Sequence, residues 1–155
     1  MEENTLDPNI RERVIHTFEK KIPFNVALGF RVTDLTLERA VISWDLQPQQ
    51  IGNFVQGILH GGVTSSALDV AGGLLATART FQRLKARTPE ELAAALAKIG
   101  TIDLRVDYLR PGRGQTFRAS AYFMRAGSRV AVTRMELHNE DDRLLATGTG
   151  TYIVG

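Results

Sequence analysis

The sequence predicts an α+β fold in which an antiparallel sheet wraps around a long central helix. Strand-like segments are grouped apart from helical ones, which is typical of antiparallel α+β layers. Their order is a helix, two strands, a long helix, a short helix and four strands. The long helical segment is apolar on nearly every side, so a surrounding layer must bury most of it. The 155 residues suffice for one such domain.

The first expected element is an amphipathic N-terminal helix over residues 7–21. Asp7 suits its N-cap and Pro8 suits its first helical position. Apolar residues recur behind them at helical spacing. Pro23 is expected to end the helix, because the residue before a proline avoids helical geometry.

Two strands follow, over residues 30–37 and 40–46. In the second strand, Ile42 and Trp44 share one face, as in a strand with one buried side. A tight turn near residues 38–39 would join the two strands as a hairpin. The domain division we expect is a helical extension over residues 1–22 and a domain over 23–155.

Residues 47–59 are expected to form a loop, and the long helix follows over residues 63–78. Its Gly72 and Gly73 each cost about 1 kcal/mol relative to alanine. We expect the close approach of another backbone to compensate for this cost. Residues 79–88 are polar and basic, so we place them outside the helix.

A short helix and four strands complete the chain. Thr88 as N-cap and Pro89 in the first turn predict the helix, which ends before Gly100. The four strands are residues 102–108, 116–125, 129–138 and 144–154. Glycine- and asparagine-rich turns separate them. In the last strand, Gly148 and Gly150 share a face and leave room for tight packing.

Composition excludes several classes of site. The chain has no cysteine, which excludes disulfides, iron–sulfur clusters and a cysteine nucleophile. Its 19 basic and 17 acidic residues do not have the balance of a nucleic-acid binder. The start of the chain is polar and acidic, and no segment reads as a membrane span, so we expect a cytoplasmic protein. The three histidines are isolated and no G-x-S-x-G elbow is present, which disfavours a metal site and a serine hydrolase.

Residues 53–73 carry the strongest chemical signal. His60, Gly61 and Gly62 lie where a loop becomes the long helix. The first amides of a helix are unpaired and partly positive, and glycine lets a ligand oxygen approach them. Such amides can stabilise a developing oxyanion. Asp69 lies in an apolar run, where a carboxylate is costly, so it either performs chemistry or specifies packing.

The spacing of Asp69 and His60 predicts a homodimer. They are nine residues apart, which is about 13 Å along a helix. The carboxylate therefore cannot easily serve the amide end of its own helix. Two antiparallel copies of the helix would bring each Asp69 to Gly61 of the partner subunit, giving two composite sites.

These residues resemble a known family. The pattern H-G-G-(x)6-D and the segment YLRPG are similar to the PaaI-like group of hot-dog-fold thioesterases. GILHGGVTSSALDVAGG and TIDLRVDYLRPGRG are similar to the bacterial YigI-type medium- and long-chain acyl-CoA thioesterases. The resemblance covers residues 22–154. It implies the hot-dog fold, dimers that often pair into tetramers, and hydrolysis of acyl-CoA thioesters without a cofactor.

The resemblance also implies roles for individual residues. Asp69 takes the position of the catalytic carboxylate, which activates water or attacks the carbonyl to form an anhydride. Gly61 takes the position whose N–H polarises the thioester carbonyl. His60 takes the position of the loop histidine, which supports the turn or the thioester.

The chain departs from the family pattern at two positions. Phe54 stands where many relatives carry Asn or Gln. Either Asn53 or Gln56 could bind the water or the carbonyl instead, and Asn53 is favoured. Gly73 stands where some relatives carry Ser or Thr, so any hydroxyl must come from elsewhere.

Arginines near turns are candidates for binding the phosphates of coenzyme A. They are Arg110, Arg113 and Arg125, whose planar forks suit phosphate; the alternative is an ordinary solvated surface. The N-terminal helix and residues 79–100 are expected to cover a tunnel for the acyl chain.

Two other functions compete with hydrolysis. A hot-dog hydratase or dehydratase would carry its histidine in a His-Phe-Pro context, which is absent here. A non-catalytic acyl-CoA-binding module would not need Asp69 or the glycine pair. The carrier, either coenzyme A or acyl-carrier protein, and the choice between a dimer and a dimer of dimers stay open.

Overall fold

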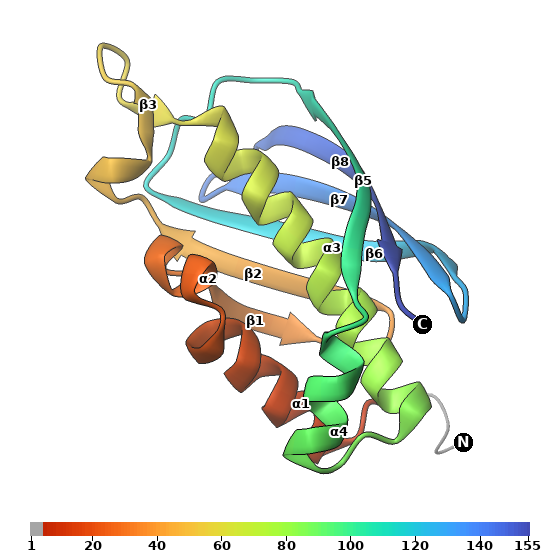
Figure 1. Ribbon diagram of the computed structural model, residues 1–155. Helices are drawn as coiled ribbons and strands as arrows, with labels where there is room; N and C mark the ends of the chain where they lie inside the picture. The colour runs from red at the N-terminus through yellow and green to blue at the C-terminus, as the bar shows by residue number, and fades with distance from the viewer. Residues whose placement is uncertain (1–4) are drawn as a thin grey trace.

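The predicted fold, a curved antiparallel sheet around one long helix, is confirmed (Figure 1). The computed structural model describes residues 5–155, so residues 1–4 of the predicted N-terminal extension lie outside it. The helix at the centre is α3, Gly61–Leu84. The six strands, in their order across the sheet, are β1 (Arg31–Leu35), β2 (Arg39–Asp45), β6 (Thr116–Ala126), β7 (Val130–Asn139), β8 (Leu144–Ile153) and β5 (Gly100–Tyr108).

All neighbouring strands of this sheet are antiparallel, and β1 and β5 form its two edges. In β2, Ile42 and Trp44 are buried in the core as predicted, but Val41 on the opposite face is buried as well, so the strand does not alternate strictly between buried and exposed residues. The pairing of β5 with β8 is irregular at one point: the register shifts between Thr101 and Asp103. Such a bulge inserts an extra residue into one strand.

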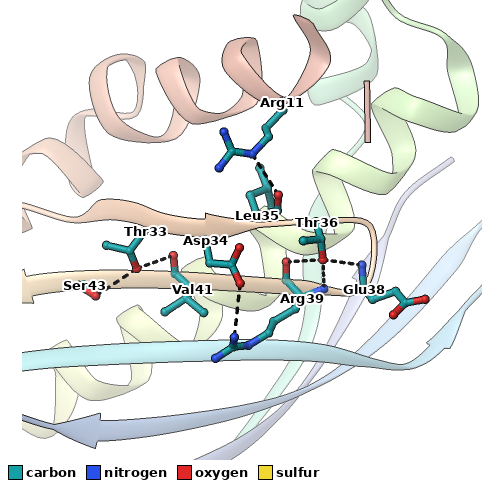
Figure 2. A network of polar contacts seen from close by, with 9 residues as sticks. All are labelled: Arg11, Thr33, Asp34, Leu35, Thr36, Glu38, Arg39, Val41 and Ser43. Carbon is teal, nitrogen blue, oxygen red and sulfur yellow. Dashed lines mark hydrogen bonds and ion pairs between the residues drawn. The ribbon is translucent and has the colours of Figure 1, made fainter. Parts of the chain in front are cut away.

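The turn between β1 and β2 lies where the sequence places it. Figure 2 shows the Thr36 hydroxyl accepting hydrogen bonds from the N–H groups of Glu38 and Arg39, at 3.2 and 3.0 Å. In the same view, Nε of Arg11 donates to the carbonyl oxygen of Leu35 at 3.1 Å. The hairpin is therefore closed by its own side chains and tied to the N-terminal helix.

The N-terminal segment is helical as predicted but has one more helix than expected. Helix α1 (Pro8–His16) begins at Asp7, whose carboxylate accepts from the N–H of Asn9 at 2.8 Å, and continues as the π-helical turn η2 (Thr17–Lys21). The helix ends before Pro23, and Pro23 then begins helix α2 (Pro23–Leu28). Proline is well suited to a first helical position, which explains the extra helix. The predicted boundary at residue 22, between a helical extension and the rest of the domain, stays a prediction.

Helix α3 extends further than the polar character of residues 79–88 indicates. The prediction ended at residue 78, whereas the helix ends at Leu84. Thr80 and Phe81 are buried while Arg79 and Arg83 reach solvent. The last turns are therefore amphipathic, and their polar residues form the wet face of the same helix.

The close packing at Gly72 comes from side chains, not from the backbone that the sequence led us to expect. A Cβ atom there would lie 2.6 Å from Oγ1 of Thr133 and still closer to the hydroxyl of Tyr152. At Gly73 the nearest atom, Cε1 of Tyr152, would lie at an ordinary 3.6 Å. The predicted tight packing on β8 is confirmed at Gly148, where a Cβ atom would lie 3.2 Å from the nearest backbone oxygen.

The segment predicted as a loop contains a small hairpin that precedes α3. After the 3-10 turn η3 (Pro48–Gln50), β3 (Ile51–Asn53) pairs with β4 (Ile58–Leu59). Strands of two or three residues are too short to show a periodic pattern, which is why the sequence does not predict them.

The second predicted short helix is confirmed as α4 (Pro89–Leu96). Thr88 and Glu91 form a reciprocal capping box at its start. Helix α4 lies beside α1 near the C-terminal end of α3 (Figure 1). Within residues 5–155, no helix is long and apolar enough to cross a membrane.

Candidate active site

The first turn of α3 leaves one backbone amide free. His60 is its N-cap, and its Nδ1 accepts from the N–H of Gly62 at 2.7 Å. The carbonyl oxygen of His60 accepts from the N–H groups of Val63 and Thr64, at 3.0 and 3.3 Å. Of these first four helical amides, only that of Gly61 meets no acceptor among residues 5–155. An unpaired amide at the start of a helix is a donor of the kind that can stabilise a developing oxyanion.

Glycines allow the neighbouring segments to close on His60. A Cβ atom on Gly52 would lie 2.8 Å from Cα of His60, and one on Gly62 would lie 2.9 Å from its Nδ1. On the other side, the N–H of Leu59 donates to the carbonyl oxygen of Gly112 at 2.9 Å, and a Cβ on Gly112 would strike Leu59. The β3–β4 hairpin and the loop after β5 are thus packed around the start of α3.

Tyr108 lies over Gly61 at the end of β5. Its hydroxyl donates to the carbonyl oxygen of Gly61 at 2.7 Å. A pocket of about 380 Å³ opens beside these two residues, and Thr64, Arg110 and Leu145 also line it. The free amide therefore lies at a cavity large enough for part of a small-molecule ligand.

Asp69 is held by hydroxyl groups from two strands. Oγ1 of Thr101 donates to Oδ1 of Asp69 at 3.0 Å, and the Tyr152 hydroxyl donates to the backbone oxygen of Asp69 at 3.1 Å. Burial and the negative charge of Asp69 raise the pKa of Tyr152 well above its ordinary value. Tyr152 therefore remains a hydrogen-bond donor throughout the usual pH range.

The expectation that Asp69 is buried is wrong for the single chain. Its apolar neighbours face the sheet, whereas Asp69 lies on a half-exposed strip of α3 with Ser66 and Gly73. Asp69 and Gly61 are eight residues apart, or about 12 Å along the helix. One chain therefore does not bring the carboxylate and the free amide together.

Asn53 and Gln56 each have a hydrogen-bond partner, Asn53 within the β3–β4 hairpin and Gln56 in the loop after β5. Oδ1 of Asn53 accepts from the N–H groups of Val55 and Gln56, both at 3.2 Å. Oε1 of Gln56 accepts from Nη2 of Arg113 at 2.9 Å. Both side chains support the tip of the hairpin, and a part for either of them in binding water stays a prediction.

Two of the three candidate arginines lie near the start of α3. Nη1 of Arg110 donates to the carbonyl oxygen of Leu144 at 2.8 Å, and Arg113 holds Gln56. Arg125 lies near the opposite end of β6, about 30 Å along the strand from its first residue. Arg110 and Arg113 therefore lie in the same loop after β5 but bind different partners, and Arg125 lies elsewhere.

Sequence reasoning missed the hydroxyl groups of Thr101, Tyr108 and Tyr152. Thr101 is 32 residues from Asp69, and Tyr152 is 83 residues from it. No local spacing signals such contacts. Thr101 and Tyr152 are cross-strand partners in the β5–β8 pairing, so only the sheet register brings both to the helix.

Comparisons with known proteins agree with the resemblance seen in the sequence. The family model described as "Thioesterase superfamily" matches residues 56–146. The Escherichia coli K12 protein named "Medium/long-chain acyl-CoA thioesterase YigI" is 49% identical over 138 residues, which are 89% of each chain. A Shewanella oneidensis crystal structure related to the thioesterase superfamily is 47% identical, covers 96% of this chain and 99% of that chain, and has a TM-score of 0.87. The structure of the Escherichia coli PaaI protein has a TM-score of 0.76, and the match covers 97% of this chain and 96% of that chain. At 20% identity it shows likeness of fold alone.

Proposed function

Because this chain belongs to the thioesterase superfamily, we propose that it hydrolyses medium- to long-chain acyl-CoA to a free fatty acid and CoA. The observation that carries the substrate class is its 49% identity, over 89% of both chains, with a protein named for that activity. The free amide of Gly61 and the oriented carboxylate of Asp69 support the same reaction.

The proposed chemistry assigns one step to each of these groups. Asp69 takes a proton from water, and the resulting hydroxide attacks the thioester carbonyl. The N–H of Gly61 of the partner subunit then stabilises the tetrahedral oxyanion. The C–S bond breaks, and the CoA thiolate leaves and takes up a proton. In the alternative route, the carboxylate itself attacks to form a mixed anhydride, which water hydrolyses.

The active form in this proposal is a homodimer with two shared sites. Two features of the single chain support it. Strand β5 is an edge of the sheet, with unpaired backbone groups available to another strand. The half-exposed strip of α3 around Asp69 faces away from the chain's own core.

The space for a long acyl chain is proposed to be bounded by the N-terminal helices and α4. Both segments line a pocket of about 700 Å³, whose apolar lining includes Phe81, Leu92 and Leu96. Arg110 and Arg113, near the start of α3, are the candidates for binding the phosphates of CoA, and Arg125 is a more distant one.

Thiol release from an acyl-CoA series, acetyl to palmitoyl, tests the proposal. We expect the wild type to prefer medium or long chains, and Asp69→Asn to lose about a hundredfold or more in kcat. Asp141→Asn, the same change in the exposed β7–β8 turn, is the control and should keep full activity.

Two results would contradict the proposal. If the wild type binds acyl-CoA but hydrolyses none of it, the protein is a binding module. If Asp69→Asn hydrolyses as fast as the control, the carboxylate is not the base or the nucleophile.

A further inference from the structure

We propose that Tyr108 is a positioning residue that, together with His60, holds the Gly61–Gly62 peptide so that the free amide of Gly61 keeps its direction. This inference rests on the proposed function, in which that amide polarises the thioester carbonyl. It adds a residue to which neither the sequence pattern nor the comparisons give a role.

One peptide unit is held at both of its polar ends. Its carbonyl oxygen, that of Gly61, accepts from the Tyr108 hydroxyl at 2.7 Å. Its N–H, that of Gly62, donates to Nδ1 of His60 at 2.7 Å. Because a peptide unit is planar, two hydrogen bonds at opposite ends fix its orientation.

Such a restraint matters because two glycines stand in succession at a helix start. Glycine populates more backbone conformations than any other residue, so this turn is the part of α3 most free to reorient. A rotation of the Gly61–Gly62 unit would change ψ of Gly61, the angle that sets this unit relative to the preceding peptide, which carries the Gly61 N–H. Preorganised donors are effective because they need no such reorganisation during the reaction.

The surroundings of Tyr108 favour this role over simple packing. The side chain is 57% exposed, so its ring contributes little to the core. The ring nevertheless lies against the backbone: a Cβ atom on Gly61 would be 3.3 Å from Cε1 of Tyr108. Tyr108 also lines the pocket beside the free amide. Its hydroxyl is thus the part of the side chain with a defined partner.

The same geometry determines the tautomer of His60. Since Nδ1 accepts a hydrogen bond, the neutral ring carries its proton on Nε2. Asparagine can replace the acceptor, because its side chain is also a strong N-cap, but it cannot replace the Nε2–H donor. The substitution His60→Asn therefore distinguishes two roles of His60: support of the turn through Nδ1 and direct contact with substrate through Nε2–H.

Tyr108→Phe removes the hydroxyl and keeps the ring. We expect kcat for the best acyl-CoA to fall about threefold to tenfold, the loss of one hydrogen bond, with KM and Tm unchanged. Tyr122→Phe, a half-exposed tyrosine in β6 outside the site, is the matched control. Equal kcat in the two variants would overturn the proposal, and so would parallel losses of kcat and Tm.

Two further variants test the other end of the peptide. His60→Ala should lower kcat, and His60→Asn should recover most of the loss because it restores the acceptor for the N–H of Gly62. If Asn is no better than Ala, His60 does not act through this hydrogen bond.

An NMR measurement tests the restraint without any turnover. In Tyr108→Phe, the amide signals of Gly61 and Gly62 should shift and the Gly61 amide should exchange faster with solvent; in Tyr122→Phe they should not change. Unchanged signals in Tyr108→Phe refute the restraint whatever the activity. A wild type that fails to hydrolyse acyl-CoA refutes the proposed function instead.

Discussion

At the scale of single residues, Asp69 is oriented by hydroxyl groups that its own helix does not supply. Gly73 stands one turn after it and carries no side chain. Thr101 supplies a donor to the carboxylate from β5, and Tyr152 holds the backbone oxygen from β8. The residue types at positions 60, 61 and 69 could be singled out from the sequence because they lie in one short segment. The hydroxyls could not, because the sheet register alone brings them there.

Thr101→Val tests whether the hydroxyl orients the carboxylate. Valine keeps the branched shape, so the strand should be unaffected, while kcat should fall about threefold to tenfold through loss of one hydrogen bond. Steady-state kinetics on the preferred acyl-CoA measure this. Thr151→Val in β8 is the control, and a kcat for Thr101→Val equal to that of the control would show that the hydroxyl has no such role.

At the scale of elements, α3 packs in the core along its length, and at one of its two adjacent glycines, Gly72, side chains from the sheet leave no room for a Cβ atom. The sequence predicts the helix and the strands that surround it, because these are long segments with clear periodicity. It also predicts close packing at the glycines of the helix. It misses the β3–β4 hairpin and places the end of α3 too early. Both errors have a physical cause: very short strands have no period, and polar residues in a helix's last turns resemble a loop.

Alanine substitutions at the two adjacent glycines of α3 should have opposite effects on stability. Gly72→Ala should destabilise the fold by roughly 1–2 kcal/mol, since overpacking against Thr133 and Tyr152 outweighs the gain in helix propensity. Gly73→Ala should stabilise it by up to about 1 kcal/mol, since its Cβ meets only an ordinary contact. Urea unfolding of both variants measures the difference, and shifts of the same sign would contradict this account of the packing.

At the scale of the whole molecule, the two halves of the proposed site are separated along one helix. The free amide lies at the first residue of α3 and the carboxylate eight residues later. A rigid helix cannot bring them together, which is why the proposed reaction takes its amide from a second chain. The sequence shows the spacing of Gly61 and Asp69. It does not show the free sheet edge that a partner would join, because that edge is known only from the order of the strands.

Mixing two inactive variants tests the shared site. Gly61→Pro removes the amide hydrogen and adds a ring, at a helical position that favours proline, and Asp69→Asn removes the proposed base. Each alone should be inactive, while a refolded equal mixture should recover up to about a quarter of wild-type activity through hybrid dimers with one intact site.

Gly61→Ala is the control for the first variant, because it keeps the N–H and has the same Cβ close to Tyr108. No recovery in a mixture that sedimentation shows to contain dimers would argue that each site belongs to one chain.

The irregular register of β5 lets one strand contact both halves of the proposed site, Asp69 and Gly61. Thr101 and Tyr108 are seven residues apart, and an odd separation in a regular strand puts two side chains on opposite faces. The shift between Thr101 and Asp103 changes that parity, so that both hydroxyls reach α3, one at Asp69 and the other at Gly61. A perfectly regular strand could present only one of them. Because of this bulge, a single edge strand places one hydroxyl at the carboxylate of Asp69 and the other at the carbonyl oxygen of Gly61, beside the free amide.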